Sequence, residues 1–174
     1  KILKNKNIRS AFLDSEILMA KAINKSREFI LLNPQKILEQ KNLDYFRKLI
    51  SKRSRRKPIA QIIKKKFFWD SEFIISKDTL IPRPDTELIV NNILRLTQNK
   101  NKLSILDIGI GSGCILLSIL KERHDFYGTG IDISKKCLNI SKLNAIELQV
   151  NSRLKLFKSN VDKFNLGKYD LIVS

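Results

Sequence analysis

Three glycines at alternating positions form the segment Gly109-Ile110-Gly111-Ser112-Gly113, which lies between two apolar runs. The run before it ends in Asp107, and the run after it, residues 114–120, has the composition of a buried helix. Glycine permits a tight turn and lets the backbone approach a ligand closely. The start of a helix adds main-chain N–H groups that bind polar or anionic atoms. The segment therefore predicts the nucleoside-binding turn that joins the first strand and helix of a doubly wound sheet.

Polar residues that follow the next two predicted strands complete this candidate site. A strand over residues 126–131 ends in Asp132, and a strand over residues 153–157 leads to Asn160 and Val161. A carboxylate at Asp132 can accept hydrogen bonds from both hydroxyls of a ribose, and an amide at Asn160 suits the edge of adenine. The predicted cofactor-binding residues are Gly109, Ile110, Gly111, Ser112, Gly113, Asp132, Asn160 and Val161.

The spacing of the glycines favours S-adenosylmethionine among the nucleoside cofactors. A dinucleotide-binding loop needs a glycine where this chain has Cys114, and a phosphate-binding loop needs a Gly-Lys-Ser/Thr sequence that is absent. S-adenosylmethionine carries no phosphate, so its loop needs no lysine. We therefore expect this cofactor and rank a nicotinamide-dependent enzyme well below it.

The elements that must position these residues predict an α/β fold. Strands over residues 104–108, 126–131, 153–157 and 169–173, separated by helices and loops, are typical of a Rossmann-like sheet. Residues 1–64 show helical spacing of apolar residues and predict a small helical domain. Aromatic and β-branched runs around Asp70-Ser71-Glu72 predict a β-hairpin linker over residues 65–79, with an exposed base-stacking surface as the alternative. The methyltransferase-like domain then covers residues 80–174.

The net charge of +17 is unevenly distributed along the chain. Residues 1–66 hold 19 Lys or Arg against 5 Asp or Glu, whereas residues 67–174 hold 15 against 12. Such asymmetry indicates a surface that faces an anionic partner, such as nucleic acid or an acidic protein. A Lys-rich composition and a solvated helix end at residues 52–57 are the competing explanations, and the sequence leaves them open.

Composition excludes several other classes of protein. No apolar run approaches the length of about 18 residues that a membrane-spanning helix needs. Two cysteines and a single histidine form neither a disulfide framework nor a zinc site, so no metal is predicted. These features predict a cytoplasmic protein with free thiols.

Four segments in the order "KPIAQII", "FFWDSEFIIS", "TLIPRPDTELIV" and "ILDIGIGSGCILLSIL" resemble the glutamine N5-methyltransferases of bacterial peptide chain release factors, the HemK/PrmC family. The resemblance implies that the helical domain grips the release factor and that the eight residues given above bind S-adenosylmethionine. It also implies that Arg83–Glu87 lie alongside the cofactor pocket. The implied reaction is methylation of the side-chain amide of the glutamine in a Gly-Gly-Gln motif.

The resemblance also implies that this chain is a fragment. The family's Asn-Pro-Pro-Tyr motif, which orients the substrate amide, is expected directly after "DLIVS", where the sequence given stops at Ser174. A methyltransferase sheet of this kind has seven strands, and only four are predicted. We therefore predict no catalytic residue in the chain and no methylation by this fragment alone.

Two further functions remain open on the sequence. The same chemistry serves the amino groups of RNA or DNA bases, and the basic amino-terminal region would suit a nucleic acid. A non-catalytic remnant that keeps the helical domain as a binding module is the other alternative.

Overall fold

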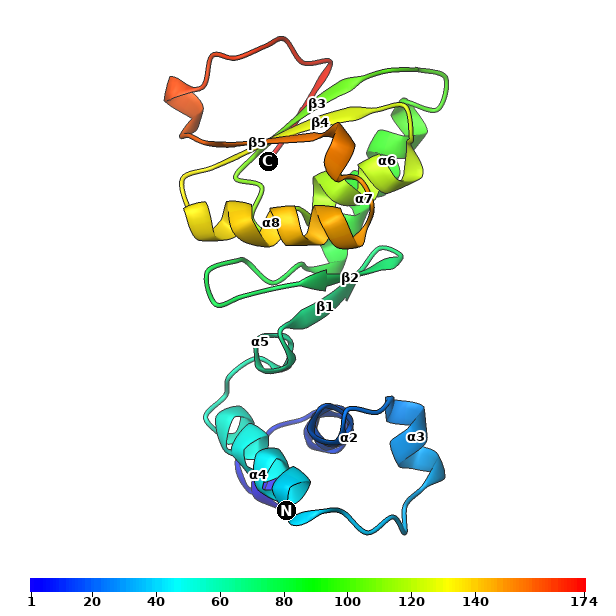
Figure 1. Ribbon diagram of the computed structural model, residues 1–174, viewed down its shortest axis with the longest axis vertical. Coiled ribbons are helices and arrows are strands. Elements are labelled where there is room, and N and C mark those ends of the chain that lie inside the picture. Colours follow the sequence, from blue (N-terminus) through cyan, green and yellow to red (C-terminus); the bar gives the residue numbers. More distant parts are fainter. The chain divides into compact units, whose positions relative to one another are not determined.

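The computed structural model describes residues 1–174, which form two compact units, Lys1–Lys64 and Lys65–Ser174. Figure 1 shows the first unit as helices and the second as a sheet with helices and a hairpin. No helix in the structure is both long enough and apolar enough to cross a membrane.

The first unit is built from five helices around a small apolar core. They are α1 (Ile2–Asn5), α2 (Ala11–Ile23), α3 (Arg27–Leu32), α4 (Gln40–Ser54) and α5 (Ile59–Ile63). Leu18 of α2 and Leu49 of α4 are buried at the centre of the core. The Arg53 side chain of α4 donates a hydrogen bond to Asp14 of α2 at 2.6 Å, and both side chains are largely buried. This ion pair fixes the register of the two longest helices of the unit.

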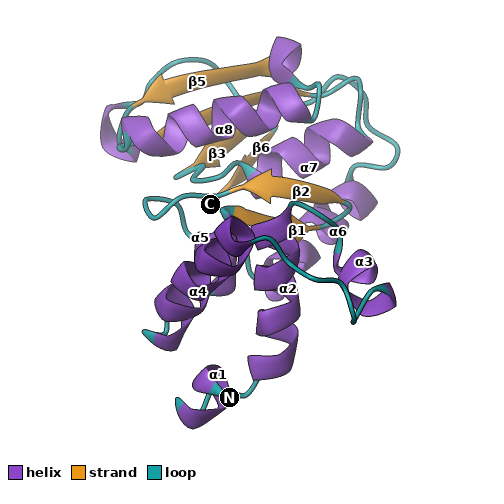
Figure 2. Ribbon diagram, turned by 60° about the horizontal axis from the view of Figure 1, so that its bottom comes forward, coloured by secondary structure: helices purple, strands orange, loops and turns teal.

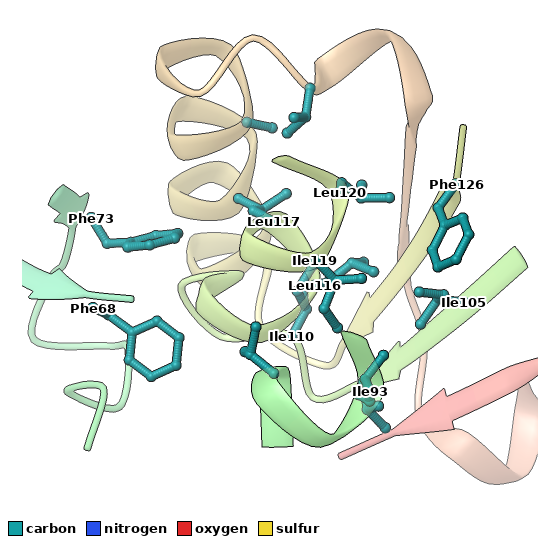
Figure 3. Packing of buried hydrophobic residues seen from close by; sticks show 14 of the residues in the cluster. Phe68, Phe73, Ile93, Ile105, Ile110, Leu116, Leu117, Ile119, Leu120 and Phe126 are labelled. Atoms are coloured by element: carbon teal, nitrogen blue, oxygen red, sulfur yellow. The ribbon is translucent and has the colours of Figure 1, made fainter. Parts of the chain in front are cut away.

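The predicted β-hairpin is confirmed. Strands β1 (Lys65–Phe68) and β2 (Ser71–Ile74) pair antiparallel, with Trp69 at a positive φ in the turn. The rings of Phe68 and Phe73 meet edge to face at 6.1 Å between centroids, and both are buried in the core of the second unit. Figure 3 shows the two rings pointing toward Ile110 and Leu117. These two rings are therefore not available for base stacking, whereas Phe67 of β1 is 64% exposed, so the base-stacking alternative stays open at that residue.

The second unit contains the expected parallel α/β sheet. Its strands are β3 (Ser104–Ile108), β4 (Tyr127–Asp132), β5 (Leu154–Lys158) and β6 (Leu171–Val173), in the order β5-β4-β3-β6. All three strand pairs are parallel. The chain crosses from β5 past β4 and β3 to β6, so β3 and β6 flank the point at which the strand order reverses. Ligands of open α/β sheets bind at the carboxyl ends of the strands at such a point.

Helices form the layer between the sheet and the hairpin. They are α6 (Glu87–Leu96), α7 (Cys114–Glu122) and α8 (Lys135–Glu147), with short 3₁₀ helices η1 (Pro84–Thr86), η2 (Asn151–Arg153) and η3 (Val161–Lys163) in the connections. Figures 1 and 2 both show α7 and α8 against one face of the sheet, with the hairpin on the far side of these helices. Leu116, Leu117 and Leu120 of α7 are fully buried there.

Arg153 is the last residue of η2, directly before β5, and its side chain binds the end of α7. Its guanidinium donates hydrogen bonds to the carbonyl oxygens of Leu120 (2.7 Å), Phe126 (2.9 Å) and Arg123 (3.0 Å). The last carbonyls of a helix have no partner within the helix, so a cation that binds them stabilises the helix end.

We expect Arg153→Met to lower the free energy of unfolding by about 2–3 kcal/mol, because three partly buried carbonyls lose a charged donor. Urea unfolding of the full-length protein measures this loss. Lys155→Met, at an exposed position two residues away, serves as the control and should change stability by less than about 0.5 kcal/mol. Equal losses in the two variants would show that the guanidinium has no special role.

Candidate functional site

The glycine-rich segment forms a loop over the carboxyl end of the sheet. Gly109, Gly111 and Gly113 all have positive φ angles, between 57° and 81°. Residues with a Cβ atom rarely adopt such angles. The N–H groups of Gly109 and Ile110 both donate to the carbonyl oxygen of Ile131, at 2.8 and 3.0 Å. The loop that follows β3 is therefore anchored to the end of β4.

Asp132, the last residue of β4, shapes the loop through its carboxylate. One oxygen, Oδ2, accepts a hydrogen bond from the N–H of Gly111 at 3.1 Å, and Oδ1 accepts one from the N–H of Ser134 at 2.8 Å. Each carboxylate oxygen has two lone pairs, so the group retains capacity for two further donors. The sequence predicted this residue as a ribose ligand, and that role stays a prediction.

Asp107 is the residue of the site whose importance the sequence analysis missed. Its side chain is 2% exposed, and its Oδ2 atom is buried without a hydrogen-bond partner. Burial, and secondarily the negative charge of Asp132, raises the pKa of the Asp107 carboxyl to about 7. A buried carboxyl without a full set of partners is uncommon in native proteins and marks a candidate functional group. The available signal was a carboxylate inside the apolar run of residues 105–110.

A cavity of about 220 Å³ opens between this loop and the segment before α6. Asp107 and Gly109–Ser112 line it on the sheet side, Leu80–Arg83 and Thr86 line it on the other, and Ser174 also borders it. Cys114 reaches the same cavity, but burial raises the pKa of its thiol to about 11, so the thiol is neutral at physiological pH. Larger hollows of about 520 and 450 Å³ elsewhere have no carboxylate in their walls. The smaller cavity is therefore the candidate site.

The Pro-Arg-Pro segment forms one wall of the cavity. Pro82 is buried, Arg83 and Thr86 line the cavity, and η1 leads directly into α6. Glu87 lies further along, and its Oε1 atom accepts a hydrogen bond from the N–H of Trp69 in the hairpin turn at 2.9 Å. This bond links the wall of the cavity to the hairpin.

Asn160 and Val161 lie beyond the cavity walls. The N–H of Ser159 donates to the carbonyl oxygen of Asp132 at 3.2 Å, which brings the end of β5 beside the end of β4. The Asn160 side chain caps η3 by accepting a hydrogen bond from the N–H of Lys163 at 3.1 Å, and Val161 is 54% exposed. The structure thus brings Gly109–Ser112 to the cavity, puts Gly113 at the start of α7, and leaves Asn160 and Val161 one strand away.

Two family models match the chain. The PrmC N-terminal domain matches residues 1–63, and the methyltransferase small domain matches residues 84–174, more than half of the chain.

Curated relatives extend the similarity across both matched regions. A release factor glutamine methyltransferase of Caulobacter vibrioides is 33% identical over 99% of this chain and 60% of its own length. A protein of the same name from Leptospira interrogans is 39% identical over 84% of this chain and 51% of its own length. A bifunctional methyltransferase of Rickettsia bellii is 34% identical over 99% of this chain and 36% of its own length. The chain thus spans between about a third and three fifths of the length of these relatives.

Proposed function

Since the chain belongs to the methyltransferase small domain family and carries a PrmC N-terminal domain ahead of it, we propose that the protein is a release factor glutamine methyltransferase. The reaction is transfer of a methyl group from S-adenosylmethionine to the side-chain amide of the glutamine in a Gly-Gly-Gln motif. Release factors act in translation, so the reaction belongs in the cytoplasm.

The buried, unpartnered Oδ2 of Asp107 is the single observation that supports the cofactor best. S-adenosylmethionine carries an ammonium group on its methionine part, and an ionised carboxylate in a low-dielectric wall is its chemical complement. The positive φ angles of the glycine loop leave main chain, rather than side chain, facing a ligand. The carboxylate and the glycine-rich loop that line the cavity therefore fit S-adenosylmethionine.

The remaining residues of the site would hold the nucleoside part. Asp132 retains lone pairs for the ribose hydroxyls, and Asn160 with Val161 would meet the adenine from the next strand. The bound cofactor supplies a methyl group activated by a sulfonium cation. The protein's part is orientation: a planar amide is a poor nucleophile, so its methylation depends on a preorganised site.

The first unit would contact the protein substrate. Lys1–Lys64 hold 17 Lys or Arg and 5 Asp or Glu, and Arg27, Arg47 and Arg53 are engaged in ion pairs within the unit. The exposed cations of α4 and the residues that follow it include Lys48, Lys52, Arg55 and Lys57. These leave a strongly positive surface for an anionic partner.

A methyl-transfer assay tests the proposal. We expect the full-length protein, incubated with a release factor and S-adenosylmethionine labelled on its methyl group, to transfer label to the Gly-Gly-Gln glutamine. A release factor in which this glutamine is replaced by asparagine is the control and should stay unlabelled. Cofactor binding without label on the release factor would contradict the proposed substrate.

The positive surface of the first unit favours one second candidate, methylation of base amino groups in RNA. Adding total RNA in place of the release factor distinguishes the two. Label on RNA and none on the release factor would favour the second candidate. Binding of RNA to the protein would also weaken steeply with added salt, because the binding of a polyanion releases counterions.

A further inference from the structure

Two polar side chains of α8 hold the glycine loop from the side of the helix layer. Ser141 is fully buried, and its hydroxyl donates to the carbonyl oxygen of Gly111 at 2.7 Å. The same hydroxyl lies 3.2 Å from the carbonyl oxygen of Cys137 in its own helix, so the bond to the loop is the shorter one. The loop is therefore tied to α8 as well as to β4.

Asn144 lies one turn further along α8, and both the nitrogen and the oxygen of its side-chain amide form hydrogen bonds. It is 1% exposed. Its Nδ2 group donates to the carbonyl oxygens of Ser112 (2.8 Å) and Ile74 (3.0 Å), and its Oδ1 atom accepts from the N–H of Ile74 (2.7 Å). The paired bonds to Ile74 take the place of a neighbouring strand at the free edge of β2.

These bonds set the orientation of two consecutive peptide groups in the loop. All peptide bonds of the chain are trans, so a carbonyl oxygen and the following N–H point to opposite sides. Because the Gly111 carbonyl points to Ser141, the N–H of Ser112 points away from α8, and Ser112 lines the candidate cavity. Because the Ser112 carbonyl points to Asn144, the N–H of Gly113 is directed away from α8 and donates to Ile110 at 2.7 Å.

The helix and the loop are in direct contact at this point. A Cβ atom added to Gly113 would lie 3.5 Å from Cβ of Ser141 and 2.8 Å from Leu117. Apolar residues would fill this space without a desolvation cost if packing were the only requirement. Instead, α8 buries two polar side chains whose partners are backbone atoms of the loop and the hairpin.

We propose that Ser141 and Asn144 are positioning residues for the cofactor loop, and that Asn144 couples the hairpin to this loop. This inference rests on the proposed function, because it assigns the loop to cofactor binding. Ser141 fixes the peptide that turns the N–H of Ser112 to the cavity. Asn144 fixes the next peptide and makes its position depend on Ile74 of the hairpin.

Binding of S-adenosylhomocysteine to the full-length protein, measured by titration calorimetry, tests the inference without requiring any methyl acceptor. We expect Ser141→Ala to weaken binding about 5- to 10-fold, the equivalent of one buried hydrogen bond. Alanine is favoured in helices, so this variant should still fold, with Tm lowered by about 2–8 °C because the buried carbonyl of Gly111 loses its donor. Asn144→Ala should weaken binding by at least about 10-fold, because it releases Ser112 and Ile74 together.

Two controls separate positioning from general stability. Asn139→Ala changes an exposed position of the same helix and should leave the affinity unchanged. In the double variant, the two losses should combine to less than their product, because both act through one loop. Hydrogen exchange at the N–H of Ile74 should rise in Asn144→Ala and stay unchanged in Ser141→Ala.

Kinetics of methyl transfer give a second readout. The positioning role predicts a raised KM for the cofactor, with kcat and the KM for the release factor within about twofold of the natural protein. If the natural protein and the Ser141→Ala variant bind S-adenosylhomocysteine with equal affinity, the positioning role is overturned and the proposed function is not. If the natural protein does not bind S-adenosylhomocysteine at all, the proposed function is overturned, and this inference is overturned with it.

Discussion

Asp107→Asn is expected to weaken cofactor binding about a hundredfold at pH 8, because the variant loses a buried charge opposite a cationic group. The same change should make the folded protein more stable at that pH. Asparagine keeps the size and shape of the side chain but replaces one carboxyl oxygen with an NH2 group, so the side chain carries no charge at any pH. Opposite changes in affinity and stability from a single substitution are the signature of a group retained for binding.

The sign of the stability change follows from the raised pKa of Asp107. An aspartate in an unfolded chain titrates near 4, whereas burial raises the pKa of this carboxyl in the folded protein to about 7. The folded state therefore holds the proton more tightly, and its stability falls as the pH rises from about 4 to about 7. The total loss is at most about 4 kcal/mol, the value of three pKa units. Urea unfolding at pH 5 and pH 8 should show about two thirds of this loss in the natural protein, because the remainder falls below pH 5, and a smaller loss in Asp107→Asn.

Cofactor affinity should show the opposite pH dependence. In the proposed site, the ionised form of Asp107 would bind the ammonium group, so affinity should fall up to about tenfold for each unit of pH below 7. Asp107→Asn should bind weakly and with little dependence on pH over the same range. Asp162→Asn, at an exposed position in η3, should behave like the natural protein. Affinity that is independent of pH in the natural protein would exclude Asp107 as the ammonium ligand.

The sequence predicted the elements of the second unit because their signals are local. Glycines at alternating positions, an apolar run on each side and polar residues after each strand specify the β3 loop and its neighbours without knowledge of contacts. The hairpin was predictable for the same reason, since its polar turn lies between two apolar runs. In each case a stretch of about ten residues contains the whole pattern.

The parts that the sequence did not predict depend on contacts between distant segments. The Oδ2 atom of Asp107 is buried without a partner because β4, β6 and α7 surround the side chain, and nothing in residues 105–110 fixes that outcome. Ser141 and Asn144 bond to atoms 30 to 70 residues away. They therefore look like ordinary polar residues of a surface helix until the fold is known. Their role follows from three-dimensional neighbours, and no spacing rule could have identified it.

Gly130→Ala is expected to displace the glycine-rich loop, residues 109–113, because Gly130 of β4 lies against the Ile110 side chain of that loop. A Cβ atom at this position of β4 would lie 2.2 Å from Cδ1 and 3.2 Å from Cβ of Ile110, whose side chain is buried under the loop. Rotation of the Ile110 side chain relieves the first contact but not the second, so the loop itself must shift. We expect a loss of about 2–3 kcal/mol in the free energy of unfolding, as is usual for an overpacked core. Cofactor affinity should also fall about tenfold, because the loop would no longer hold its preorganised geometry.

Gly128→Ala, two residues earlier in the same strand, is the matched control. The three atoms nearest to a Cβ atom there are outer methyl groups of Leu116 and Leu120 in α7, at 2.9–3.0 Å, and none of the three belongs to the loop. Its loss of stability should be similar or smaller, and folded Gly128→Ala protein should bind the cofactor as the natural protein does. Titration calorimetry below the Tm of both variants makes the comparison. Equal affinities in the two variants would mean that Ile110 adjusts without moving the loop, and that the loop owes its position to Asp132 and α8 alone.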